Sequence, residues 1–169
     1  KSGRARAAVP ARKRGPTTRL DASTRRMAAR ALSSGSALLE YVVPPGGLVA
    51  FAVTRDAFHV LRRADATEAC LTSMLQRLAL QIARADQSVA GVPLPADPAL
   101  ASNLQALADV LLADVLDDLP GVERLVVVPH GILHQVPFHA LPLGDGVLLD
   151  RYEVVYAPSA DVYRLCGAG

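Results

Sequence analysis

The stretch RLVVVPHGILHQVPFHALPL, residues 124–143, gives the strongest local indication of the fold. It begins with Arg124–Val128, in which a leucine and three valines follow one another. Wholly apolar, β-branched runs of this length are typical of strands that are covered on both faces. A second such run, Glu153–Tyr156, comes after a connecting segment. A strand, a crossover and a further strand together predict an α/β fold with a parallel sheet flanked by helices.

Upstream of this stretch, three β-prone runs lie close together, at residues 37–43, 48–54 and 57–62. A Pro-Pro-Gly-Gly segment separates the first two, and Arg55-Asp56 separates the second pair. These spacings are typical of turns between antiparallel strands. The sequence therefore predicts an N-terminal antiparallel β-meander that leads into the parallel sheet.

Two amphipathic helices are expected between the meander and residue 124. In residues 67–86, apolar side chains recur at i, i+4, i+7 and i+11, which places them on one helical face: Leu71, Leu75, Leu78 and Ile82. The second helix is expected to start at Pro98 with Asp97 as its N-cap, and to end before the Leu-Pro-Gly of residues 119–121. A last helix is expected after Pro158, with Ser159 at its start.

Charge is distributed unevenly along the chain. Residues 1–30 hold ten of the 18 Lys and Arg residues and a single acid, Asp21, which leaves eight basic and fifteen acidic residues in 31–169. We expect residues 1–35 to be a basic linker, partly helical at its end, and residues 36–169 to form the folded unit. The linker lacks interleaved aromatic residues and a recognition motif, so a solvated segment is favoured over a nucleic-acid contact.

The location expected from composition is cytoplasmic. Cys70 and Cys166 are the two cysteines, and neither belongs to a CxxC pair, so neither a disulfide framework nor a zinc site is indicated. No apolar run approaches the ~18 residues that a membrane-spanning helix needs. Both cysteines are expected to be buried structural thiols.

Three of the four histidines fall within residues 130–139. His130 and His134 are four residues apart, which on a helix would place both on one face, as in HExxH zinc sites. Prolines and a glycine interrupt the segment, and the glutamate of that motif is missing, so no metal site is predicted and no cofactor is expected. His134 is expected to be half-buried and to support the loop. No G-x-S-x-G motif is present to supply a serine nucleophile.

From about Gly35 onward, the chain resembles the N-terminal half of a CHAT domain, the caspase-like cysteine peptidase domain associated with tetratricopeptide repeats. Three stretches carry the resemblance, in the same order as in the family. The first is ALLEYVV, which begins at Ala37, together with LVAFAVTRDAFHVLRR. The second is RLVVVPHGILHQVPFHALPL, which begins at Arg124, and the third is LLDRYEVVYAPSADVYRL, which begins at Leu148. The resemblance implies a caspase-like sheet, of which this chain would hold an incomplete part.

The resemblance also implies where the catalytic residues lie. In the family, the His/Cys dyad follows the segment that resembles YAPSA, so the dyad is expected C-terminal to residue 169 and no catalytic residue is assigned within the chain. His134, Pro137 and Phe138 match the family signature and are expected to be structural. His130 stands where the family more usually has Asp, and it remains the alternative catalytic candidate.

Two functions stay open at this point. The resemblance implies a fragment of a CHAT-type cysteine endopeptidase that supplies early strands and helices and is inactive on its own. Its parent would act on protein or peptide substrates, under regulatory proteins bound to upstream repeats, without a membrane. The alternative is a non-catalytic CHAT-like scaffold or protein-interaction module in signalling.

Overall fold

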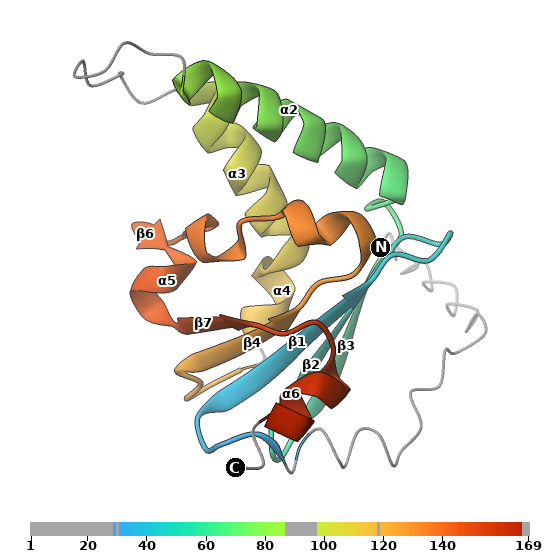
Figure 1. Cartoon of the computed structure of the whole chain (residues 1–169), viewed down its shortest axis with the longest axis vertical. Helices are drawn as coiled ribbons and strands as arrows, with labels where there is room; N and C mark the ends of the chain where they lie inside the picture. The colour runs from blue at the N-terminus through green and yellow to red at the C-terminus, as the bar shows by residue number, and fades with distance from the viewer. Residues whose placement is uncertain (1–28, 30, 87–97, 118, 167–169) are drawn as a thin grey trace, which may run out of the picture.

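A five-stranded mixed sheet forms the centre of the computed structural model, which describes residues 29, 31–86, 98–117 and 119–166 (Figure 1). The strand order is β3-β2-β1-β4-β7. The strands are β1 (Ser36–Val42), β2 (Leu48–Val53), β3 (Phe58–Arg63), β4 (Arg124–Val128) and β7 (Glu153–Tyr156). This arrangement confirms the predicted α/β class, with an antiparallel meander leading into parallel strands.

The meander has the predicted order of antiparallel strands. β1 pairs with β2 antiparallel, with Leu38 opposite Val53, and β2 pairs with β3 antiparallel. The turn between β1 and β2 is closed by Gly47, whose N–H donates to the Pro44 carbonyl at 3.0 Å. Gly47 has a φ of 98°, a conformation that favours glycine. The Pro-Pro-Gly-Gly segment thus forms the turn that its composition indicates.

The parallel half of the sheet is built around the same central strand. β4 lies beside β1 in parallel, with Ser36 opposite Arg124 and Glu40 opposite Val128. β7 continues the sheet in parallel on the other side of β4. Because the three strands run in one direction, their carboxyl ends meet at one edge of the sheet.

The predicted helices cover one face of this sheet. The first is α2 (Glu68–Asp86), and the second is divided into α3 (Pro98–Leu111) and the short α4 (Ala113–Leu116) (Figure 1). On α2, Leu71, Leu75 and Leu78 are buried, as the periodicity predicts, whereas Ile82 is 49% exposed. The expected N-cap of α3, Asp97, lies outside the described residues.

Several small elements between β4 and β7 were not predicted. Their sequences contain prolines and glycines at a spacing that suits single turns but no long helix. They are the 3-10 helices η1 (Gly131–Gln135) and η2 (Phe138–Ala140), the two-residue strands β5 (Pro142–Leu143) and β6 (Gly146–Val147), and α5 (Leu148–Arg151). Together they form the crossover from β4 to β7.

The two faces of the sheet are covered unequally. The larger apolar cluster lies between the sheet and α2, α3, α4, η1, η2 and α5. The opposite face carries a smaller cluster, in which Leu32 and α6 (Ala160–Cys166) pack against residues of β1, β2 and β4. Both crossovers that lead to parallel strands therefore lie on the same face.

Both cysteines are exposed, so the prediction that they are buried is wrong. Cys70 directly precedes Leu71 on α2, and one residue is a rotation of about 100° around a helix. That rotation carries its thiol away from the buried face. Cys166 is the last residue of α6, a helix with no buried residue. Among the residues that the structure describes, no helix is long and apolar enough to cross a membrane.

Tyr41 joins the central strand to α3 through a buried hydrogen bond. Its side chain is 0% exposed, and its hydroxyl donates to the Leu111 carbonyl at 3.0 Å. Burial raises the pKa of the Tyr41 hydroxyl, because the phenolate would lose its hydration. The folded chain therefore holds this proton more tightly than the unfolded chain does.

We expect Tyr41→Phe to lower the free energy of unfolding by about 1 kcal/mol at pH 7, the usual contribution of a buried hydrogen bond. The stability that the protonated hydroxyl gives is fully present below the unfolded tyrosine pKa of about 10, and it is lost as the pH rises above that value. The gap between Tyr41→Phe and the original chain should therefore narrow above pH 10. Urea unfolding between pH 7 and 11 measures this gap, and a gap that stays constant would contradict the burial effect.

Candidate functional site

The candidate site lies at the carboxyl ends of β1 and β4. At this edge the chain leaves β1 toward β2 on one side, and it leaves β4 toward η1 and the crossover to β7 on the other. A pocket of about 250 Å³ occupies this position. It is lined by Val42, Val43, Pro44, Val49, Phe51, Arg62 and His130.

His130 stands at the rim of this pocket. It is exposed and extended (φ −126°, ψ 139°), and it is the N-cap residue of η1 without a side-chain cap hydrogen bond. Its carbonyl accepts from the Leu133 N–H at 3.1 Å, which holds the first turn of η1. Within the described residues its imidazole has no hydrogen-bond partner. The structure therefore places His130 at the end of a strand, as predicted, but beside no described cysteine that it could activate.

Glu40 is a charged neighbour of the site that the sequence analysis did not single out. It occupies a position of β1 between Leu38 and Val42, on the face that α6 covers. Burial raises the pKa of the Glu40 carboxyl, the nearby Asp161 of α6 raises it further, and His130 lowers it. The sequence does contain a feature that could have indicated Glu40. It is an acid inside the apolar run ALLEYVV, and its strand neighbours on the same face are apolar.

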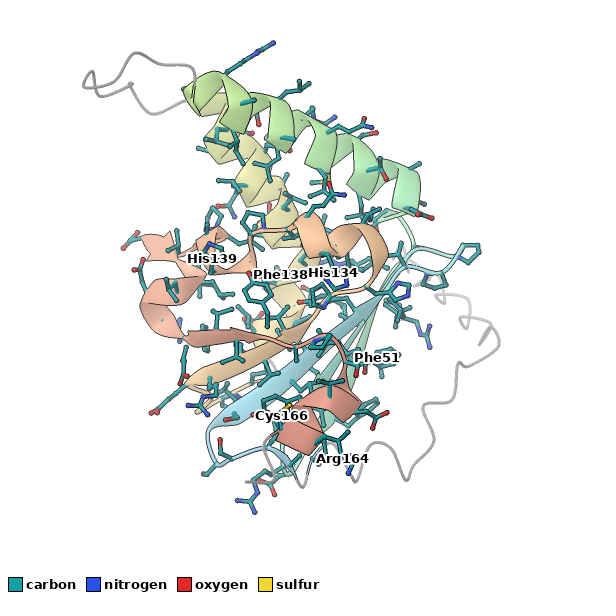
Figure 2. The ribbon with its side chains drawn as sticks, viewed as in Figure 1. Phe51, His134, Phe138, His139, Arg164 and Cys166 are labelled. Carbon is teal, nitrogen blue, oxygen red and sulfur yellow. The ribbon has the colours of Figure 1, made fainter. Side chains whose placement is uncertain are left out.

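Phe138, a residue of the family signature, is buried in the segment between β4 and β7. Its side chain is 0% exposed, and its ring centroid lies 5.2 Å from that of Tyr41 and 6.4 Å from that of Tyr156. Pro137 is half-buried, and its carbonyl accepts from the Ala140 N–H at 2.9 Å, which closes η2. Phe138 thus anchors the crossover segment on the central strand (Figure 2). The structural assignment of this signature remains a prediction.

His134 and His139 both project from the crossover, and neither reaches the pocket. His134 is exposed, not half-buried as expected. The buried residue of η1 is its neighbour Leu133. His139 forms a pair with Tyr156 that the sequence analysis did not predict. The Tyr156 hydroxyl lies 3.0 Å from His139 Nδ1 and accepts from the His139 backbone N–H at 3.3 Å. No local pattern could indicate this contact, because it joins residues 17 positions apart.

Ser159 directly precedes α6, and Cys166 is its last residue. Ser159 Oγ accepts from the Val162 N–H at 3.1 Å, which confirms its predicted place at the start of a helix. Asp161 of α6 lies near Glu40, and Tyr163 lies near Arg124 at the other end of the strands. The helix therefore runs away from the strand carboxyl ends, which places its last residue, Cys166, toward the other end of the sheet. Figure 2 shows Cys166 and Phe138 on opposite sides of the sheet.

A second pocket, of about 460 Å³, lies at the opposite end of the sheet. Its lining comes from the segments before β1 and β4 and from the β2–β3 turn, and it includes Ser33, Thr54, Arg55 and Gly121. Neither the carboxyl ends of the parallel strands β1, β4 and β7 nor the family-signature residues contribute to it. Across the described part of the chain, no group of three His, Cys, Asp or Glu side chains is placed to hold a metal ion.

Comparison with known proteins adds three findings. The chain is similar to a solved structure entitled "Crystal structure of apo psk41 parM protein", with 10% identity and a TM-score of 0.38 over 86% of this chain. This chain spans 46% of that structure's length, and a likeness at this level establishes neither fold nor function. No curated protein matches the chain. The family model of the CHAT domain matches residues 101–168, and this match confirms, over that part of the chain, the CHAT-domain resemblance predicted from the sequence.

Proposed function

We propose that this chain supplies the early strands and helices of a CHAT-type cysteine endopeptidase whose His/Cys dyad lies C-terminal to residue 169. The observation that supports the proposal is the CHAT-domain match over residues 101–168, which includes β4 and β7. The positions of the two cysteines also support the proposal. Cys70 lies on the solvent side of α2 and Cys166 at the far end of α6, so neither is a partner for the described histidines.

The sheet suits this role because its parallel strands present their carboxyl ends at one edge. β7 is the outermost strand on the parallel side. No strand of the described residues pairs with its outer side, so a further strand could pair there. Parallel strands added there would bring their own ends to the same edge as His130. In the proposed mechanism, a cysteine thiolate attacks a peptide carbonyl, a histidine transfers the proton, and backbone N–H groups stabilise the oxyanion.

The substrates in this proposal are proteins or peptides. Regulatory proteins would act through tetratricopeptide repeats upstream in the parent protein, with the basic residues 1–35 as the connection. The chain's own part in the reaction is to hold the sheet edge in place. In this proposal, the nucleophile and the base come from residues C-terminal to residue 169.

The test compares the 169-residue chain with its full-length parent on a fluorogenic casein substrate. We expect no turnover from the chain, and turnover from the parent that is lost when the cysteine of the downstream dyad is replaced by alanine. His130→Ala in the parent should retain turnover, since His130 is not assigned to the dyad. Circular dichroism of each variant shows that loss of turnover is not loss of fold.

Two outcomes would contradict the proposal. Turnover by the 169-residue chain that His130→Ala abolishes would place the active site within the chain. A folded parent with no turnover, and with no alkylation of a downstream cysteine by iodoacetamide, would favour the scaffold alternative. In that case the sheet would be retained for protein interaction rather than for catalysis.

A further inference from the structure

The pocket at the ends of β1 and β4 is lined mainly by apolar side chains, together with Arg62 and His130. Its floor is apolar, with Phe51 5% and Val49 6% exposed, and Val42 and Val43 are half-buried at its side. Arg62 and His130 are the lining residues that can carry charge, and no acidic residue is among the described residues that line it. The pocket is thus apolar inside and cationic at the rim.

The cationic rim stands out against the surrounding charge. Residues 31–169 carry fifteen acidic and eight basic residues, a net charge of about −7. Arg62 and Arg63 are adjacent on β3 and face opposite sides of the sheet. Arg63 pairs with Asp114 at 2.7 Å, whereas Arg62 has no ion-pair partner in the part of the chain that the structure describes. An unpaired guanidinium beside an apolar floor is a ready partner for a carboxylate.

The size of the pocket decides between kinds of ligand. Cavities that hold cofactors or drug-sized molecules usually measure ~300–1,000 Å³, so about 250 Å³ is small for such a ligand. One large apolar side chain of a peptide fits a pocket of this size better. A peptide also places a neighbouring carboxylate at the rim, within reach of Arg62.

We propose that this pocket binds a protein segment in which a large apolar side chain stands one or two residues from Asp or Glu. The apolar side chain occupies the space over Phe51 and Val49, and the carboxylate pairs with Arg62. Glu40 of β1 lies near His130, so an acid is already placed close to that imidazole. Arg62 is therefore the main selector for negative charge. The proposal goes beyond the peptidase function and does not depend on where the dyad lies.

The test is a selection from a random heptapeptide library displayed on phage, against the immobilised 169-residue chain. We expect enrichment of peptides with Leu, Met or Phe next to Asp or Glu. The same selection on Arg62→Glu should lose these peptides, and the selection on Arg77→Glu should keep them. Arg77 is an exposed residue of α2 and gives the same charge change away from the pocket.

Fluorescence anisotropy with the most enriched peptide then gives the magnitudes. We expect Arg62→Glu to weaken binding by about tenfold or more, the loss of a charge-assisted hydrogen bond, and Arg62→Gln to weaken it by less. Replacing the acidic residues of the peptide by Lys should abolish binding to the original chain and restore part of it to Arg62→Glu. Circular dichroism confirms that the variants are folded, as expected for exposed residues.

Several results would overturn the proposal. These are no enrichment, enrichment of basic peptides, or acidic peptides that bind Arg62→Glu as well as they bind the original chain. A dimer in sedimentation velocity that Arg62→Glu dissociates, without peptide binding, would assign the pocket to a second copy of the chain. Each of these outcomes rejects an acidic-apolar partner, whether or not the parent protein cleaves peptides.

Discussion

Replacing Gly47 by alanine is expected to lower the free energy of unfolding by roughly 3 kcal/mol or more, from backbone strain and overpacking together. A Cβ atom at this position would overlap the Arg63 carbonyl oxygen and lie 2.8 Å from Ala64 Cα. Both neighbours are backbone atoms, so no side-chain rotation relieves the clash. The φ of 98° adds strain for any residue with a side chain.

The surrounding hydrogen bonds prevent an inexpensive adjustment. The Gly47 N–H donates to the Pro44 carbonyl, and the Leu48 N–H donates to the Ala66 carbonyl, each at 3.0 Å. Moving the turn to admit a methyl group would break one or both of them. Gly46→Ala is the matched control, because a Cβ there meets no atom within 4 Å and its φ is not positive. Urea unfolding that shows equal stabilities for the two variants would contradict this account.

Phe138→Ala is expected to cost about 3–5 kcal/mol, the usual range for truncating a buried aromatic side chain. Phe138 is fully buried and packs on Tyr41 of the central strand, so its loss leaves a cavity between the crossover and the sheet. Thermal unfolding followed by circular dichroism measures the effect. A large loss of stability would support the assignment of this family-signature residue to architecture.

The controls for Phe138 are on the same segment. Phe138→Leu keeps an apolar side chain in the site and should cost less than half as much. His139→Ala removes an exposed side chain, and the backbone N–H that donates to Tyr156 remains. That variant should lie within about 1 kcal/mol of the original chain. A Phe138→Ala variant as stable as His139→Ala would show that the crossover is not anchored by this ring.

The regular elements could be predicted because their periodicity is strong. The runs that became β4 and β7 were predicted with the observed bounds, and the meander strands were displaced by one residue at most ends. For α2, the leucine spacing gave the buried face correctly over Leu71, Leu75 and Leu78. These elements follow from local patterns of apolar side chains, and tertiary packing agrees with the local preference.

The site could be predicted only in part, because its composition depends on tertiary contacts. His130 was recognised as a strand-end residue from its local sequence. Its neighbours in the pocket, Phe51 and Arg62, come from β2 and β3, more than 60 residues earlier. Their meeting depends on the register of four strands, which no local pattern specifies. The cysteines were misplaced for a related reason, since a neighbour on the buried face of a helix does not imply burial.

The central position of β1 has a consequence for the order of folding. On one side Leu38 pairs with Val53, 15 residues later, and on the other side it pairs with Val126, 88 residues later. Short loops close at lower entropic cost than long ones, and non-local parallel pairing is slow. The meander therefore has the kinetic advantage, and β4 docks afterwards on an edge of β1 that is already formed. During translation, β1 and β2 leave the ribosome well before β4, so the β1 edge stays unpaired until β4 has also left the ribosome.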